Sequence, residues 1–196
     1  MKQSWLHKQS LNKLIVFCNG WGMDEHPFRP LHSFGYDVLM LYDYSDLVHG
    51  LDIGKIFAEY DEVKSEVKVG EKHRLDLMVS KNGPNSSNAH TCYIEIKNCS
   101  LVEDGVACFP DAVTVRGRNH LIELQQLAAS GFRAVMFILV NRMDAKIFKP
   151  ADHIDPAYGK ELRKAYQNGV EIMVYDVEYD LKQGRVGLRS QIPFQL

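Results

Sequence analysis

Two short runs in which polar and apolar residues alternate constrain the fold of this chain more than any other feature. They are residues 74–79 and 93–97. Because successive side chains of a β-strand point to opposite faces, each run predicts a strand with one apolar and one polar face. The polar loop 81–90 separates the runs, and pairing them as a hairpin places Asp76 directly opposite Glu95. Lys97 shares the face of Glu95.

This arrangement brings two carboxylates and one ammonium to one face of a sheet. Asp76 and Glu95 could hold a divalent cation through oxygen ligands, with Lys97 beside a metal-bound water. The alternative is a solvated ladder of charges across the strands, which contributes only a few tenths of a kcal/mol to stability. From the residues alone the ladder is the commoner case, so both interpretations stay open at this point.

The other hydrophobic patterns predict a mixed α/β fold in two parts. Residues 14–18 and 36–42 predict strands and 53–60 a short helix, a β-α-β-α opening that is typical of a parallel α/β layer. The charge-rich stretch 61–68 marks a boundary, which gives domains 1–63 and 64–196. Three further strands are predicted at 65–69, 134–140 and 170–179, and two helices begin at the N-caps Thr114 and Asp155 and end at Gly131 and Gly169.

Composition excludes few function classes. The chain is 45% hydrophobic and 24% charged, which is ordinary for a globular protein. It has no apolar stretch of membrane-spanning length and no signal-peptide pattern, so we expect a cytoplasmic protein with no membrane partner. Its four cysteines lack a C-x-x-C spacing and predict buried reduced thiols. Residues 64–196 carry eighteen Lys/Arg against sixteen Asp/Glu, a balance that permits nucleic-acid binding without demanding it.

Several basic side chains are candidates for contacts with phosphate. Arg116 and His120 fall on one stripe of the helix that follows Thr114, and Arg118 projects elsewhere. They are close to the positive end of the helix dipole, so they are candidates for phosphate contacts; the alternative is an ordinary exposed polar face. Arg142 follows the strand 134–140, where a loop arginine in water is favoured over a phosphate ligand. The turn 19–22 is interpreted as the end of a strand.

The segment from residue 64 to about 180 resembles the sugar fermentation stimulation protein family. The resemblance rests on Arg74-Leu-Asp76, on Tyr93-Ile-Glu95-Ile-Lys97-Asn98, on residues 109–121, 138–142 and 154–156, and on the stretch that begins at Gly169. Members of this family resemble bacterial and archaeal DNA-binding proteins whose C-terminal domain has the PD-(D/E)xK nuclease fold. The resemblance implies that Asp76 and Glu95 are the two acids of that fold's metal site and that Lys97 is its lysine.

Residues 1–63 resemble a different family, the pimeloyl carrier-protein methyl ester esterases of biotin synthesis, which are α/β-hydrolases. That resemblance rests on residues 14–24 and 36–44 and stops near Val63. The chain has no G-x-S-x-G elbow, so the serine nucleophile of such an enzyme has no counterpart. The family resembled by the second part also has an N-terminal OB-like domain and a helix before its first core strand. The OB-like domain has no counterpart here, and residues 53–60 are the candidate for the helix.

The sequence therefore predicts a bacterial fusion of two truncated genes, in which a PD-(D/E)xK-like core follows an α/β-hydrolase-like segment. We expect binding of DNA, with RNA as a second possibility, and phosphodiester hydrolysis that depends on Mg²⁺ or Mn²⁺. Asp76, Glu95 and Lys97 are the expected catalytic residues, with Asp76 and Glu95 as metal ligands. Arg74, Arg116, Arg118, His120 and Arg142 are the expected nucleic-acid contacts. The alternatives are a remnant of a carboxylic ester hydrolase and an inactive fusion.

Overall fold

The computed structural model describes residues 2–11, 13–18, 32, 35–42, 56–70, 73–81, 87–180 and 185–196. The chain forms two compact units, Met1–Ile56 and Phe57–Leu196. The larger unit thus includes residues 57–63, which lie before the domain boundary expected from the sequence. That boundary stays a prediction.

The smaller unit is a sheet of three strands in the order β1-β3-β2. β1 spans Lys2–His7, β2 spans Leu14–Cys18 and β3 spans Asp37–Tyr42; β2 runs parallel to β3, and β1 runs antiparallel to it. The strands predicted at 14–18 and 36–42 are confirmed, although Ile15 is 44% exposed and β2 is therefore not buried throughout. β1 was not predicted, because its polar sequence lacks an apolar period. The turn 19–22 lies outside the described residues. Of the helix expected at 53–60, residues 53–55 also lie outside them, residue 56 is helical and residues 57–59 form a turn.

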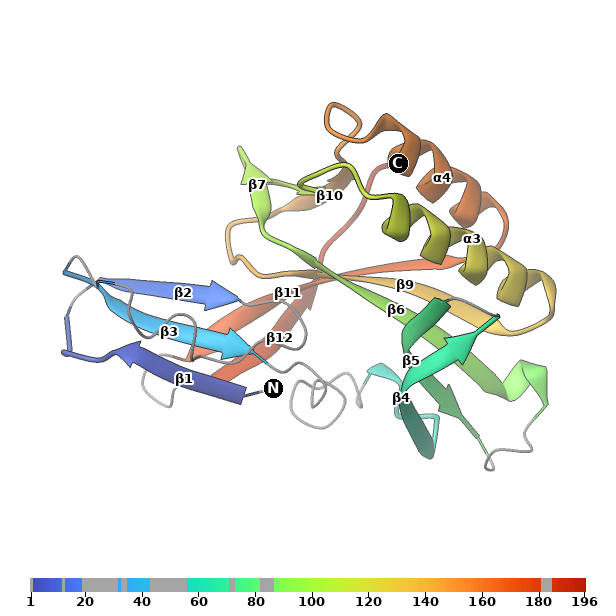
Figure 1. Ribbon diagram of the computed structural model, residues 1–196, viewed down its shortest axis with the longest axis horizontal. Helices are drawn as coiled ribbons and strands as arrows, with labels where there is room; N and C mark the ends of the chain where they lie inside the picture. Colours follow the sequence, from blue (N-terminus) through green and yellow to red (C-terminus); the bar gives the residue numbers. More distant parts are fainter. Residues whose placement is uncertain are drawn as a thin grey trace. The chain divides into compact units, whose positions relative to one another are not determined.

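The larger unit is built on a sheet of six strands in the order β12-β11-β9-β6-β5-β4 (Figure 1). Its strands are β4 (Glu62–Val69), β5 (His73–Ser80), β6 (Thr91–Cys99), β9 (Arg133–Val140), β11 (Glu171–Asp180) and β12 (Arg185–Gln191). β6, β9 and β11 are parallel, and β4, β5 and β12 are antiparallel to their neighbours. The almost wholly apolar strand β9 is buried from Ala134 to Val140, as expected for a strand covered on both faces.

Two helices pack side by side on one face of this sheet (Figure 1). They are α3 (Val115–Ala129) and α4 (Pro156–Gln167). The core beneath them contains Met136, Ile138, Leu121, Leu162 and Tyr158 among its fully buried side chains. A second, three-stranded sheet pairs β7 (Leu101–Glu103) antiparallel and β10 (Ile147–Pro150) parallel with β8 (Val106–Phe109). A short 3₁₀ helix, η3 (Asn88–His90), precedes β6.

The predicted helix boundaries are confirmed by cap geometry. Thr114 Oγ1 accepts a hydrogen bond from Gly117 N at 3.0 Å, and an Asp155 carboxylate oxygen accepts one from Tyr158 N at 2.9 Å. Each side chain satisfies an N–H group that has no partner inside its helix. Gly131, just after α3, has φ +85°, the left-handed conformation that favours glycine at a helix end. The mixed α/β fold is therefore confirmed, and no helix in the described parts of the chain is long and apolar enough to cross a membrane.

Candidate functional site

The site lies where strands β5 and β6 separate. Their ladder runs from Ser80–Thr91 to Leu77–Ile94. One step beyond it, Asp76 Oδ2 accepts a hydrogen bond from Ile96 N at 2.7 Å. A side-chain carboxylate thus takes the place of a backbone carbonyl, and it points into the opening between the strands. The same register places Asp76 opposite Glu95, as the hairpin pattern in the sequence predicts.

Glu95 is the buried centre of this site. Only 1% of it is exposed, because α3 covers the face of β6 on which it lies. Its Oε1 accepts from Lys97 Nζ at 2.5 Å and is also hydrogen-bonded to His120 Nδ1. Its Oε2 is buried and has no hydrogen-bond partner among the described residues. The solvated charge ladder considered above therefore does not describe Glu95.

The two carboxylates have opposite pKa shifts. Burial and the nearby charge of Glu95 raise the pKa of Asp76 to about 7. Burial acts on Glu95 in the same direction, but the hydrogen bond from His120 and the charge of Lys97 outweigh it and lower the pKa of Glu95. At neutral pH the pair therefore holds one firmly ionised carboxylate and one that is close to its titration point. Such separation of two acids is typical of sites that bind cations or transfer protons.

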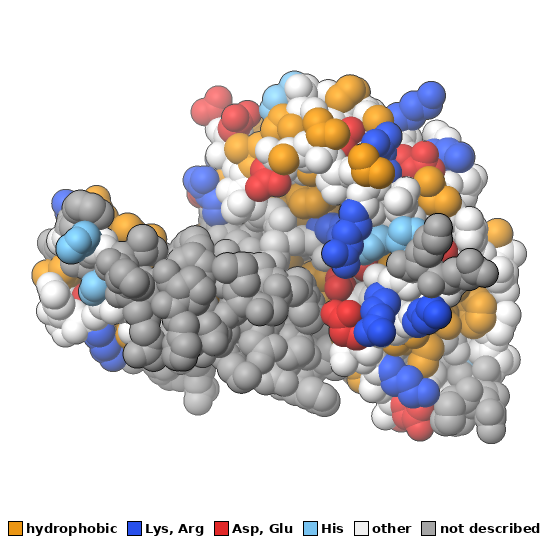
Figure 2. Space-filling view, in the orientation of Figure 1, with side chains coloured by type: hydrophobic (Ala, Val, Ile, Leu, Met, Phe, Trp, Pro, Cys, Tyr) orange, Lys and Arg blue, Asp and Glu red, His pale blue; other side chains and the backbone are white. Residues whose placement is uncertain are grey.

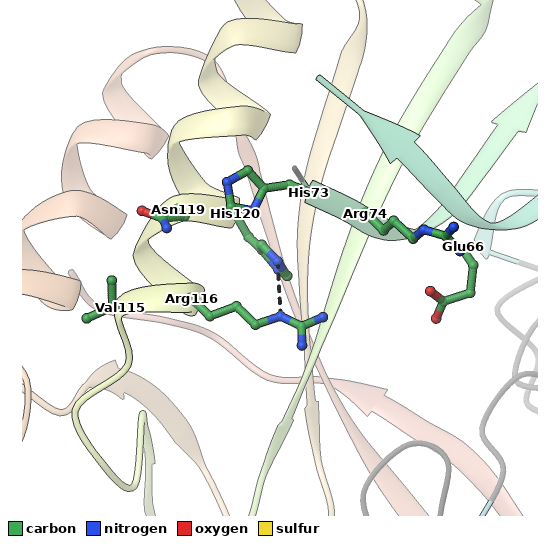
Figure 3. A pocket seen from close by; sticks show the side chains of 7 residues that line it. All are labelled: Glu66, His73, Arg74, Val115, Arg116, Asn119 and His120. Carbon is green, nitrogen blue, oxygen red and sulfur yellow. Dashed lines mark hydrogen bonds between the residues drawn. The ribbon is translucent and has the colours of Figure 1, made fainter. Parts of the chain in front are cut away.

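A cleft of about 540 Å³ opens beside His120, the residue bonded to Glu95 (Figure 3). Asp76, Glu95 and Lys97 are not among the residues that line it. Seven residues line it: Glu66 from β4, His73 and Arg74 from β5, and Val115, Arg116, Asn119 and His120 from α3. Arg116 Nε donates to His120 Nε2 at 3.4 Å, the contact drawn as a dashed line. The ring of His73 meets that of His120 edge-on, with centroids 6.1 Å apart. The cleft is therefore bordered by two guanidinium groups and carries one carboxylate at its rim.

The structure brings some of the predicted nucleic-acid residues together and separates others. Arg74 and Arg116 both line the cleft. Arg118 lies outside it, near the Asp155 carboxylate at the start of α4, whose pKa it helps to lower. Arg142 is exposed and forms a bidentate ion pair with Asp144, at 2.9 and 2.5 Å. Figure 2 shows Lys and Arg side chains beside His side chains on this unit, with acidic groups interspersed.

His120 lies deeper than the sequence predicts. The helical pattern places it on a stripe beside the buried one, yet only 2% of it is exposed. Its position is three residues after Gly117 and four before Leu124, which are both buried. This spacing from two buried residues could have predicted that His120 is buried. It was overlooked because a histidine was expected to face solvent.

Four cleft residues were not predicted at all. Asn119 follows Arg116 by one helical turn, so helical spacing could have found it. Val115, 60% exposed, begins the same helix, and His73 begins β5. Glu66 has a left-handed backbone, with φ +53° in the middle of β4, and nothing in the sequence indicates such a bend.

The ligand set for a metal is small. In the part of the chain that the structure describes, no group of three or more His, Cys, Asp or Glu side chains is arranged to hold a metal ion. Two neighbouring carboxylates are present, and one of them has an oxygen without a hydrogen-bond partner among the residues described. This donor set fits Mg²⁺ or Mn²⁺ better than Zn²⁺, because Mg²⁺ is commonly held by one or two carboxylates while water and substrate phosphate complete its shell.

Helix α3 is fixed to α4 at the end that carries the site. Thr114 N donates to Asp155 Oδ2 at 2.9 Å, while Asp155 Oδ1 caps α4. One buried carboxylate thus joins the N-termini of both helices. Arg116 and His120 are in the first two turns of α3, so this link sets their position over β6.

Comparison with known proteins gives consistent matches for most of the chain. The family model described as "Sugar fermentation stimulation protein RE domain" matches residues 46–183. That range includes residues 46–63, which the sequence comparison placed in the esterase-like segment. A sugar fermentation stimulation protein homolog from Citrifermentans bemidjiense is 48% identical over 137 residues, covering 70% of this chain and 56% of the relative. The homolog from Shewanella woodyi is 43% identical over 139 residues, covering 70% of this chain and 57% of the relative.

A solved structure is also similar. Pyrococcus furiosus SfsA in complex with Ca²⁺ matches with a TM-score of 0.65 and 26% identity, covering 78% of this chain and 62% of that one. The chain thus spans little more than half the length of the curated relatives it matches.

Proposed function

Because this chain belongs to the sugar fermentation stimulation protein family, we propose that it binds nucleic acid and cleaves phosphodiester bonds with a divalent cation. In this proposal the unit Phe57–Leu196 is a PD-(D/E)xK-like core, and its active site combines the acids of β5 and β6 with the adjoining cleft lined by β4, β5 and α3. DNA is the proposed substrate, with RNA as an alternative.

The observation that carries the proposal is the Glu95 Oε2 atom, which has no hydrogen-bond partner in the part of the chain that the structure describes. A buried carboxylate oxygen without a hydrogen bond costs several kcal/mol unless another group compensates it. Asp76, on the neighbouring strand, has a pKa that is raised by burial and, next, by electrostatic repulsion from Glu95. A divalent cation between the two would supply the missing partner and remove the repulsion.

Each residue has a role in this proposal. Asp76 and Glu95 would hold Mg²⁺ or Mn²⁺, which lowers the pKa of bound water and stabilises negative charge on a phosphate. Lys97 Nζ, 2.5 Å from Glu95 Oε1, would orient the attacking water. Arg74 and Arg116 border the cleft, where their guanidinium groups would bind phosphate oxygens. Calcium, which the similar Pyrococcus furiosus protein holds, prefers the same class of oxygen ligands as magnesium.

Strand scission tests this proposal directly. Single- and double-stranded DNA and RNA are incubated with Mg²⁺ or Mn²⁺ and with wild type, Asp76→Ala or Lys97→Ala. The matched controls are Asp152→Ala and Lys160→Ala, which remove an exposed acid and an exposed lysine outside the cleft. We expect cleavage by wild type and both controls and a loss of two orders of magnitude or more in the site variants, a typical effect for a group that acts in the transition state (roughly 10²-fold). Equal background activity in all five proteins would remove the nuclease proposal.

Two alternatives concern the first part of the chain. Residues 1–63 remain a candidate esterase-like segment, since the parallel pair β2–β3 is compatible with an α/β-hydrolase beginning. The family match from residue 46 counts against a fusion at residue 63. Labelling by a fluorophosphonate would favour an ester hydrolase, whereas absence of a cooperative thermal transition would favour an inactive fusion.

A further inference from the structure

The imidazole of His120 lies between the two halves of the proposed site. Its Nδ1 is hydrogen-bonded to Glu95 Oε1, and its Nε2 faces Arg116 Nε at 3.4 Å. With 2% exposure the ring makes these contacts away from bulk water. His120 therefore touches both a proposed metal ligand and a proposed phosphate-binding residue, and with 2% of it exposed it offers a bound nucleic acid little surface.

The partners of the ring determine its tautomer. A guanidinium is always protonated, so Arg116 Nε can only donate and His120 Nε2 must accept. The ring proton is then on Nδ1, from which it is donated to the carboxylate of Glu95. Lys97 Nζ is 3.4 Å from Nδ1, but an ammonium has no lone pair, and Nδ1 already donates to Glu95. The 3.4 Å approach is thus a contact without a hydrogen bond, and Lys97 donates to Glu95.

We propose that His120 is a positioning residue that holds Glu95 and Arg116 in fixed relative places, so that cation binding and phosphate binding reinforce each other. This inference rests on the proposed function and extends it. It assigns His120 a role other than the direct phosphate contact expected from the sequence. A neutral imidazole suits this role because it donates to one neighbour and accepts from the other.

Arg116 is placed so that it can bind His120 and a phosphate at the same time. Its Nε is directed to His120, while its side chain is exposed and lines the cleft. Within the described residues its terminal amino groups have no hydrogen-bond partner. They can therefore bind a phosphate while Nε stays on the imidazole (Figure 3). An anchored guanidinium loses less conformational entropy on binding than a free one.

Thermodynamic coupling follows from this geometry. A cation that fixes the Glu95 carboxylate also fixes the ring of His120 and hence Arg116. A phosphodiester bound to Arg116 fixes the same chain of contacts from the other end. Each ligand should then raise the affinity for the other by the same factor, because coupling between binding sites is reciprocal.

The test uses the full chain, Mn²⁺ and the dinucleotide dTpdT. Mn²⁺ affinity is measured by electron paramagnetic resonance with and without saturating dTpdT, and dTpdT affinity is measured by calorimetry with and without Mn²⁺ under conditions without turnover. We expect each ligand to tighten binding of the other by about fivefold or more. We expect the factor to fall in His120→Phe and in two half-replacements to the part that direct attraction between cation and phosphate supplies. His120→Asn keeps a donor near Nδ1, and His120→Gln keeps an acceptor near Nε2.

Nitrogen NMR of the wild type gives a readout that depends on no variant. We expect His120 to have a protonated Nδ1 and a bare Nε2. The opposite tautomer would overturn the inference even if every variant unfolds. Binding of both probes without coupling would overturn the inference and leave the proposed function standing. Binding of neither probe would overturn both.

Discussion

Asp76 Oδ2 accepts the N–H of Ile96 at 2.7 Å, one strand away, at the point where the β5–β6 ladder ends. The bond holds a carboxylate inside a sheet, where it repels Glu95 and is poorly solvated. Burial and this repulsion raise its pKa to about 7. Asp76 is therefore a source of instability when ionised, although the hydrogen bond from Ile96 itself favours the charged form. Such costs are common for residues kept for function.

We expect Asp76→Asn to stabilise the metal-free protein at alkaline pH. Between the ordinary aspartate pKa and about 7, folded Asp76 binds more protons than the unfolded chain does, so its contribution to stability falls as pH rises. Asparagine keeps an oxygen for Ile96 N–H and carries no charge. In EDTA, the free energy of unfolding of Asp76→Asn should exceed that of the wild type by roughly 1–3 kcal/mol at pH 8 and by much less at pH 4.

The matched control for this experiment is Asp152→Asn. Asp152 is exposed, and its hydrogen bond from Arg163 lowers its pKa, so its removal should slightly destabilise the protein at pH 8. Equal stability of wild type and Asp76→Asn at both pH values would contradict the raised pKa of Asp76.

Arg116 and Arg142 are expected to differ in their effect on nucleic-acid binding. Arg116 lines the cleft, whereas Arg142 is outside it and paired with Asp144. Arg116→Gln should weaken binding of a DNA oligonucleotide and reduce the slope of log K against log salt by about one. Arg142→Gln should leave both unchanged. Fluorescence anisotropy at several salt concentrations measures both quantities, and equal losses in the two variants would place the binding surface outside the cleft.

Most secondary structure of the larger unit could be predicted from the sequence because its signals are local. Thr114 and Asp155 are caps with a defined hydrogen bond, and β9 is an uninterrupted apolar run. β1 and the left-handed bend at Glu66 have no such signal, since both depend on neighbouring strands. For the polar face of β6 the alternation left a solvated ladder and a metal site open. Packing of α3 buries Glu95 on this face, and period-two alternation alone does not show which face a helix will cover.

The candidate site was predictable where it depends on register. Alternation and the intervening loop were enough to place Asp76 opposite Glu95. The link from Glu95 through His120 to Arg116 was not predictable, because it depends on how α3 lies over β6 and on two hydrogen bonds between distant segments. The separation of Arg118 from Arg116 was predictable, because two positions along a helix turn a side chain by about 200°.

Asp155→Ala should destabilise the protein strongly, although it removes only one small side chain. The carboxylate accepts from Tyr158 N in its own helix and from Thr114 N at the start of α3. Alanine would remove the N-cap of α4 and leave the N–H group of Thr114 buried without its acceptor. Together these losses should lower the free energy of unfolding by roughly 2–4 kcal/mol. Burial acts to raise the pKa of Asp155, but the hydrogen bonds from Thr114 and Tyr158 outweigh it and lower that pKa.

The pH dependence of this effect has a definite sign. The stabilisation by Asp155 is present above the ordinary aspartate pKa and is lost as pH falls through its lowered value. The difference in unfolding free energy between wild type and Asp155→Ala should therefore shrink below about pH 4. Asp144→Ala, which removes an exposed acid, is the control and should cost less than about 1 kcal/mol. A pH-independent difference would mean that Asp155 acts through packing alone.

Two glycines in the helices should respond differently to alanine. A Cβ on Gly117 would be 2.8 Å from Thr114 Cγ2 and 3.2 Å from the buried ring of Tyr158. Thr114 is held by its capping bond and Tyr158 by the core, so Gly117→Ala should cost roughly 1–3 kcal/mol despite its better helix propensity. A Cβ on Gly159 would overlap an oxygen of the Asp152 carboxylate.

Asp152 is exposed, so its side chain can move away from a new Cβ at position 159. Gly159→Ala then loses little more than the surface ion pair with Arg163 and gains about 1 kcal/mol of helix propensity. Its melting temperature should be close to that of the wild type, while that of Gly117→Ala should be several degrees lower, as about 4 °C corresponds to 1 kcal/mol in a small domain. Equal melting temperatures would show that α3 can shift from α4 at its first turn, and the fixed placement of Arg116 over β6 would then not hold.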